Sequence, residues 1–199
     1  MSSTRILVLT SFLTVVLAGA AHAQFGAASG VASRFLTFGV GGGVSVPVTD
    51  AADALKNGFN GHAFVRLNLA ALPIAPRFDI SFQRFDAKEA TLSSGVTSAS
   101  SQLLSGLANV TFPLMHGPIQ PYVLAGLGIA NVKGTSETVT GSSSTTSTDF
   151  TIDGGAGVLL RLGSLSAYVE GRLDNVYTSS DVIDADQIKV VPVTVGLTF

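Results

Sequence analysis

The sequence predicts an all-β protein: an antiparallel, up-and-down, eight-stranded transmembrane β-barrel that follows a cleaved signal peptide. Three observations lead to this fold class. Apolar residues recur at every second position in about eight segments, which is the period of a strand with one apolar face. Long and short connections alternate between these segments, as in a barrel whose long loops share one side of a membrane. Only 12% of the residues are charged and 22 are glycine, whereas soluble domains carry about 25% charged residues.

The first 23 residues have the features of a secretory signal peptide. Arg5 supplies the positive start, positions 6–18 form an apolar core, and positions 21–23 (Ala-His-Ala) form a small-x-small cleavage site. The core is too short to span a bilayer stably, so we expect cleavage before Gln24. Residues 24–199 are then predicted to form one domain, an outer-membrane β-barrel.

The composition excludes several classes of function. The chain has no cysteine, which rules out a disulfide framework and a thiolate metal site. Without Arg5 of the signal, the 11 basic residues become 10 against 13 acidic ones, a net charge of −3. This balance is unsuited to neutralising phosphates, so we expect no nucleic-acid partner.

The alternating segments are separated by recognisable turns and loops. In chain order they are 35–48, 58–70, 77–86, 102–114, 121–133, 150–162, 165–177 and 188–199. Short turns join the second to the third, the fourth to the fifth and the sixth to the seventh segment. The even number of segments places both ends of the barrel domain on the periplasmic side.

The longer connections differ in composition. Residues 49–57 are compatible with a helical turn, and the polar residues 87–101 with a loop. Residues 134–149 are almost entirely Gly, Ser and Thr and cannot bury a core, so we predict a mobile loop there. In the fifth segment, the alternation sends Tyr122 and Leu124 into the lumen unless a bulge shifts the register.

The last segment has the clearest alternation. Its apolar positions are Val191, Val193, Val195, Leu197 and Phe199. This strand must pair with the first one, because a free edge inside a bilayer would leave backbone groups unsatisfied. Pro192 is a difficulty for that pairing, since proline has no N–H to donate to a ladder.

The apolar face is predicted to contact lipid, because its aromatic residues gather at the strand ends. One group lies beside the long loops: Phe59, Phe82, Phe150 and Tyr177. A second group lies beside the short turns and the chain end: Phe38, Phe78, Phe112 and Phe199. Two such rings match the interface girdles of a membrane barrel, and the many glycines on the opposite face relieve crowding inside a narrow ring.

The polar face carries charges at mid-strand and is therefore predicted to line the lumen. An arginine facing lipid at the bilayer midplane costs about 2–4 kcal/mol. Buried charges need partners, so we expect arginines and acids to pair across the lumen as a plug. The predicted cluster consists of Arg66, Arg77, Asp79, Asp153, Glu170, Arg172 and Asp174.

These features resemble the small eight-stranded outer-membrane barrels of the OmpA-transmembrane and OmpX kind, over residues 24–199. The signal peptide and segments 119–130 (IQPYVLAGLGIA), 154–158 (GGAGV) and 192–199 (PVTVGLTF) carry the resemblance. It implies that Phe199 and its alternating partners are read by the barrel-assembly machinery. OmpA itself continues into a peptidoglycan-binding domain, and no such domain follows here, so attachment to the cell wall is not implied.

The sequence favours a structural or adhesin-like role, with outer-membrane lipid as the environment and the long loops as the place for a surface ligand. A narrow solute channel and a soluble periplasmic ligand-binding barrel remain alternatives. We expect no enzyme and no cofactor, because His62, which the pattern places near the outer rim, has no nearby Ser or acid at a suggestive spacing. We likewise expect no metal site, because two mature histidines (His62 and His116) with scattered acids form no ligand set.

Overall fold

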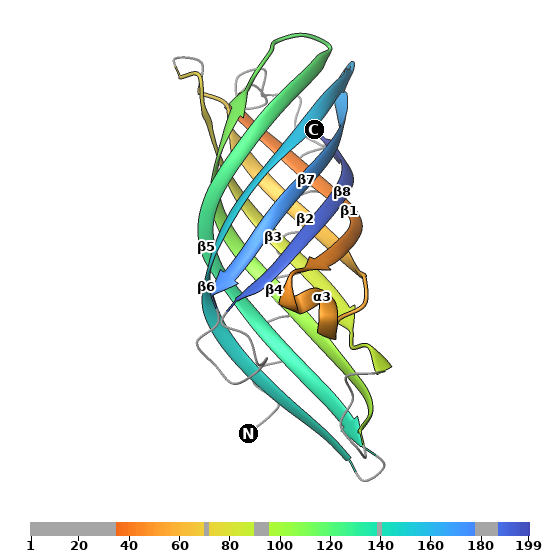
Figure 1. The fold of residues 1–199 in the computed structure, drawn as a ribbon. Coiled ribbons are helices and arrows are strands. Elements are labelled where there is room, and N and C mark those ends of the chain that lie inside the picture. Colours follow the sequence, from red (N-terminus) through yellow and green to blue (C-terminus); the bar gives the residue numbers. More distant parts are fainter. Residues whose placement is uncertain (1–34, 70–71, 90–95, 139–140, 178–186) are drawn as a thin grey trace, which may run out of the picture. The chain divides into compact units, whose positions relative to one another are not determined.

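A computed structural model describes residues 35–69, 72–89, 96–138, 141–177 and 187–199. In this part of the chain, eight antiparallel strands follow one another around a closed barrel (Figure 1). They are β1 (Leu36–Val48), β2 (Gly58–Leu67), β3 (Ala75–Asp86), β4 (Val96–Pro113), β5 (Ile119–Thr138), β6 (Gly141–Leu162), β7 (Leu165–Tyr177) and β8 (Ile188–Thr198), with a short helix α3 (Asp50–Ala54) after β1. The predicted up-and-down barrel is confirmed, and the predicted signal peptide, residues 1–23, lies outside the described residues. No helix among the described residues is long and apolar enough to cross a membrane.

The strands are staggered, so the line that joins directly paired residues moves along the barrel axis as it goes once around the ring. From Phe38 on β1, successive Cα partners lead through the other seven strands to Lys189 on β8 and back to Val48, ten residues further along β1. With a rise of ~3.3 Å per residue and ~4.8 Å between strands, this stagger gives a strand tilt of about 41° and a barrel radius of about 8 Å. A ring of that width is filled by its own side chains.

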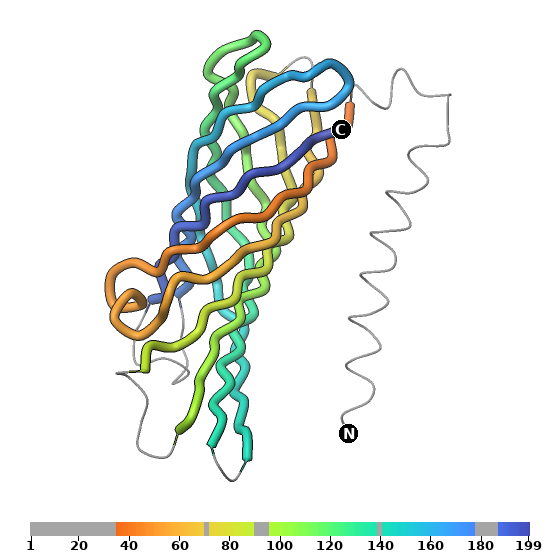
Figure 2. Tube along the Cα trace, turned by 90° about the vertical axis from the view of Figure 1, so that its right-hand side faces the viewer, coloured from red at the N-terminus to blue at the C-terminus, as the bar shows by residue number. Residues whose placement is uncertain are grey.

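The main departure from the predicted elements is at the long-loop end. The ladder between β5 and β6 continues to the pair Thr138 and Gly141, through residues predicted as a mobile loop, so that prediction is wrong. β4 begins at Val96, inside the predicted connection 87–101. Ser and Thr have no apolar alternation to detect, but they tolerate a strand when the backbone ladder of a barrel pair continues. These three strands run past the others as a projecting sheet (Figures 1 and 2).

Helix α3 covers the long-loop end of the lumen. It confirms the helical turn expected between the first two strands. Ala51 and Leu55 are buried, and the backbone N–H of Lys56 donates to the Asp86 carbonyl at 2.8 Å. Thr49, just before the helix, has a φ of 55°, which is unusual for a residue with a β-branched side chain. The β1–β2 connection is therefore folded inward and tied to the end of β3.

The outer surface of the barrel is apolar and bounded by aromatic residues. Neighbouring rings lie 6.3 Å apart for Phe38 and Phe199, and 6.1 Å apart for Phe150 and Tyr177. At the tilt given above, the aromatic group beside the short turns lies about 20 Å along the barrel axis from the group beside the long loops. The aromatic rings therefore bracket an apolar band of the height expected in a bilayer.

The structure answers two questions about the predicted strands: the register of the fifth strand and the place of Pro192 in the last one. Tyr122 and Leu124 point into the lumen and are buried, and the β4–β5 ladder runs past them without a bulge. Pro192 lies where the β7–β8 ladder is interrupted: its pairs stop at Val193 and resume at Val190. The missing N–H of proline explains the interruption on that side, while the pairing of β8 with β1 continues through Pro192.

Candidate functional site

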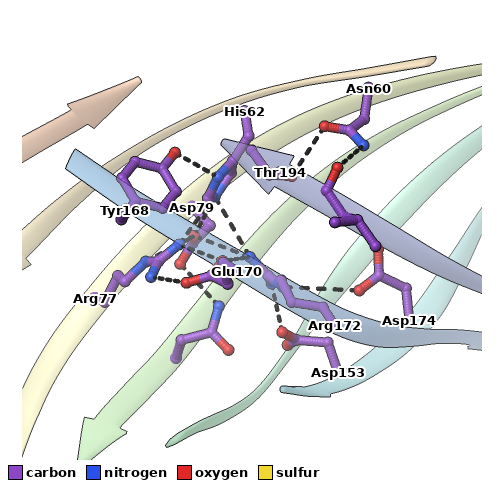
Figure 3. Close-up of polar contacts among 12 residues, drawn as sticks. Asn60, His62, Arg77, Asp79, Asp153, Tyr168, Glu170, Arg172, Asp174 and Thr194 are labelled. Carbon is purple, nitrogen blue, oxygen red and sulfur yellow. Dashed lines mark hydrogen bonds and ion pairs between the residues drawn. The ribbon is translucent and has the colours of Figure 1, made fainter. Parts of the chain in front are cut away.

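The most distinctive side-chain arrangement is a charged cluster in the middle of the lumen (Figure 3). The register brings six of the seven predicted charges together from β3, β6 and β7: Arg77, Asp79, Asp153, Glu170, Arg172 and Asp174. All six are buried. Each lies on the inward face of its strand, between lipid-facing neighbours, because side chains alternate along a strand.

Arg77 joins the two sides of the cluster. Its Nη1 and Nη2 donate to Glu170 Oε2 and Oε1 at 2.6 and 3.0 Å, a bidentate pair across the lumen. Its Nε donates to Asp79 Oδ1 at 2.9 Å, and its guanidinium carbon lies 3.7 Å from the centre of the Phe64 ring. A planar guanidinium is suited to this combination of fork-like bonding and ring stacking.

Arg172 is surrounded by four carboxylates. It donates hydrogen bonds to Asp153 Oδ2 and, at 3.1 Å, to Asp79 Oδ1. Its nitrogens lie 3.7 Å from Glu170 Oε1 and 3.8 Å from Asp174 Oδ1. Arg172 is therefore the main positive charge opposing the acids of β6 and β7.

His62 lies within this cluster, which corrects the prediction of a rim histidine without an acidic partner. Its Nε2 is 2.6 Å from Asp79 Oδ1 and 3.1 Å from Arg77 Nη2. The two residues His62 and Asp79 are 17 positions apart in the sequence, so spacing alone gave no sign of the pair. The β2–β3 register, in which His62 faces Ser81, brings them together.

Arg66 is the predicted member that does not join the cluster. Its Nε donates to the neutral Asn68 Oδ1 at 3.2 Å, and no ion pair of the described residues includes it. Arg66 faces Arg77 in the β2–β3 register, and Arg77 already engages Asp79 and Glu170. The expectation that Arg66 pairs across the lumen is therefore wrong.

Several neutral residues complete the network without having been singled out in the sequence. Tyr122 Oη donates to Glu170 Oε2 at 2.7 Å, and Asn109 Nδ2 donates to Asp79 Oδ2 at 2.8 Å. Gln83 Nε2 donates to Asp174 Oδ2 at 2.8 Å. The alternation of the sequence indicates that Tyr122, Asn109 and Gln83 face inward. Which carboxylate each of them bonds to depends on the register between the strands.

Apolar layers close the lumen on both sides of the charges. Towards the short turns lie Phe64, Tyr122, Leu124, Leu159 and Tyr168. Beneath α3, at the long-loop end, lie Ala51, Leu55, Phe85, Leu103, Ala130, Val132, Val176, Ile188 and Val190. Between the layers, a cavity of about 10 Å³ is lined in part by His62, Arg172 and Asp174, which is room for about one water molecule.

This arrangement fills the lumen around His62, where the cavity has room for about one water molecule. The charges are paired, buried and enclosed, as expected of a plug that crosslinks strands. Among the described residues, no group of three or more His, Asp or Glu side chains is placed to hold a metal ion.

The alternating apolar residues of the final strand, β8, from Val191 onward, lie on the lipid-facing side of the barrel, as the sequence predicts. Val193, Val195, Leu197 and Phe199 are exposed on the lipid-facing side, and Val191 is half-buried on the same side. Backbone bonds of 2.9 and 3.0 Å join Phe199 to Phe38 and close the barrel. The role of these five residues as an assembly signal stays a prediction.

Comparison with known proteins identifies the fold family. Residues 10–199 match the family described as outer membrane protein beta-barrel domain. The chain belongs to this family. It is thus an outer-membrane β-barrel protein, embedded in membrane lipid. A search of curated protein sequences finds no significant match.

Solved structures with the same fold cover nearly the whole barrel. Neisserial surface protein A is 13% identical with a TM-score of 0.59, covering 82% of this chain and 95% of that one. A major outer membrane protein of Thermus thermophilus is 14% identical with a TM-score of 0.58, covering 82% and 98%. Ail, the attachment invasion locus protein of Yersinia pestis, is 15% identical with a TM-score of 0.53, covering 83% and 99%. At these identities the likeness concerns the fold alone.

Proposed function

We propose that this protein is a surface-interaction barrel whose contact element is the projecting sheet of β4, β5 and β6. The observation that carries this proposal is an edge of β6 that has no strand beside it among the described residues, called the free edge below. Residues 142–148 of β6 pair with β5 on one side, and no described strand pairs with them on the other, since the first described pair of β6 with β7 is Phe150 with Tyr177. An unpaired row of backbone groups is a template for another strand.

The geometry identifies which backbone groups face the free edge. The Ser147 carbonyl accepts from Asn131 Nδ2 of β5 at 3.2 Å, so the backbone of Ser147 points toward β5. Because backbone groups alternate sides along an antiparallel strand, residues 142, 144, 146 and 148 point to the free edge. An extended peptide could exchange about eight hydrogen bonds with these four positions, at two bonds for each.

The chemistry of the sheet favours a peptide over a polyanion. The part of the sheet beyond the barrel carries Lys133, Glu137 and Asp149 as its charged residues, and positions 142–148 are all Ser or Thr. A solved structure of Ail contains the heparin analogue sucrose octasulfate. A highly charged ligand of that kind would need a basic cluster, which the projecting sheet lacks among its described residues.

The closed lumen argues against a solute conduit. Two apolar layers flank a paired charge cluster, and a cavity between them measures about 10 Å³. A hydrated solute would have to displace both layers. The barrel is better suited to anchoring the sheet than to conducting.

The test uses the mature barrel in lipid nanodiscs and a phage-displayed library of linear peptides. We expect enrichment of strand-forming peptides and protection of the amides of residues 142–148 from hydrogen exchange. Ser144→Pro removes an edge N–H without removing a bond to β5 and should abolish binding, whereas Ser144→Ala keeps the N–H and should bind normally. Failure to enrich peptides, or equal binding by both variants, would refute the proposal.

A further inference from the structure

Two arginines face the lumen at the barrel end formed by the short turns. Arg66 lies near the end of β2, in phase with the buried inward residues His62 and Phe64. Arg161 lies near the end of β6, in phase with the buried inward residue Leu159. β2 and β6 are four strands apart in a ring of eight, so the two arginines project from opposite walls.

Neither arginine is neutralised by a described acid. Arg66 Nε donates to Asn68 Oδ1, and Arg161 Nη2 donates to Gln120 Oε1, each at 3.2 Å. Both acceptors are neutral amide oxygens. The ion pairs formed inside the described barrel involve Arg77, Arg172 and His62 and include neither of these arginines.

Arg66 lies near two other positively charged side chains. Arg77 faces it in the β2–β3 register, and both Arg77 and Arg161 act on its guanidinium as like charges. Glu170, which could offset them, is held by Arg77 and Tyr122. A half-buried charge beside like charges is costly unless a counterion compensates it.

We infer that this mouth of the lumen binds a small oxyanion of the phosphate class between Arg66 and Arg161. Two uncompensated guanidinium groups match a doubly charged oxyanion, and guanidinium forks bind phosphate oxygens in pairs. Arg66 is half-buried and Arg161 is exposed, so a soluble anion reaches the site from the short-turn side. The apolar layer that contains Tyr122 and Leu159 closes the lumen beyond the site. The site is at the opposite end from the projecting sheet and does not depend on the proposed surface role.

The test is a titration of the mature barrel with inorganic phosphate in phosphate-free, low-salt detergent solution, followed by calorimetry. We expect saturable binding of one phosphate per barrel, weakened by added sodium chloride because salt screens partly exposed charges. Arg66→Gln and Arg161→Gln should each weaken binding by about tenfold or more, since each removes a charge-assisted hydrogen-bonding group. Arg84→Gln is the matched control and should bind as the unchanged protein does, because Arg84 is exposed on the outward face of β3, near the long-loop end.

Two results would overturn the inference. One is the absence of saturable phosphate binding. The other is equal affinity in Arg161→Gln and Arg84→Gln, both of which alter exposed side chains and should fold, as heat-modifiable gel migration can verify. The same titration in nanodiscs of phosphatidylcholine should give the same affinity; its loss there would assign the site to a lipid headgroup and refute a soluble ligand.

Discussion

Replacing Arg172 with methionine should destabilise the barrel far more than the same change at an exposed arginine. Arg172 is 5% exposed, and its nitrogens lie within 4 Å of four carboxylates. Methionine fills a similar volume without the charge. The change leaves Arg77 as the one arginine facing the four acids of the described cluster.

The magnitude follows from the cost of leaving buried charges without a partner. Removing one member of a buried ion pair typically costs about 3–5 kcal/mol, and we expect a loss in this range for Arg172→Met. Arg84→Met is the control, because Arg84 is exposed and faces outward; its effect should stay within about 0.5 kcal/mol. Asp153 forms an ion pair with Arg172, so adding Asp153→Asn to Arg172→Met should recover part of the loss.

The free energy of unfolding can be measured by reversible urea unfolding in lipid vesicles. The chain has no tryptophan, so far-ultraviolet circular dichroism or the gel mobility of folded and unfolded forms should be followed. A loss for Arg172→Met within about 1 kcal/mol of that for Arg84→Met would refute the view that the lumen cluster stabilises the barrel.

Three further changes test other parts of the structure. Deleting Phe199 should lower surface levels in cells much more than it lowers the urea midpoint of barrel already folded in detergent; normal surface levels would contradict its role in assembly. Gly43→Ala should cost about 1–3 kcal/mol or more because the new Cβ clashes with the Val193 carbonyl oxygen, whereas Gly61→Ala meets nothing within 4 Å and should be nearly neutral. Leu55→Ala should cost about 2–5 kcal/mol by opening the apolar layer beneath α3, and an unchanged unfolding curve would show that α3 does not seal the lumen.

The local sequence pattern was sufficient to predict the number of strands and which face of each strand points into the lumen. Every second residue of a membrane barrel faces lipid, so the apolar and polar faces differ strongly along each strand. That contrast located β7 at its observed residues, 165–177, and identified the inward side of Arg77, Asp79 and Glu170. It did not detect the projecting sheet, because Ser and Thr alternate with one another and mark neither face.

Sequence patterns alone predict a membrane barrel of eight strands with charges inside, because strand period and lipid contact are properties of neighbouring residues. Which charges meet depends on how distant strands are aligned in the folded ring. Arg77 and Glu170 are 93 positions apart and His62 and Asp79 are 17 apart; the register around the ring aligns both pairs. The same register leaves Arg66 facing another arginine, and among the described residues it begins the pairing of β6 with β7 only at Phe150. A shift of one residue would turn every side chain of a strand to its other face, so register is a property of the closed ring.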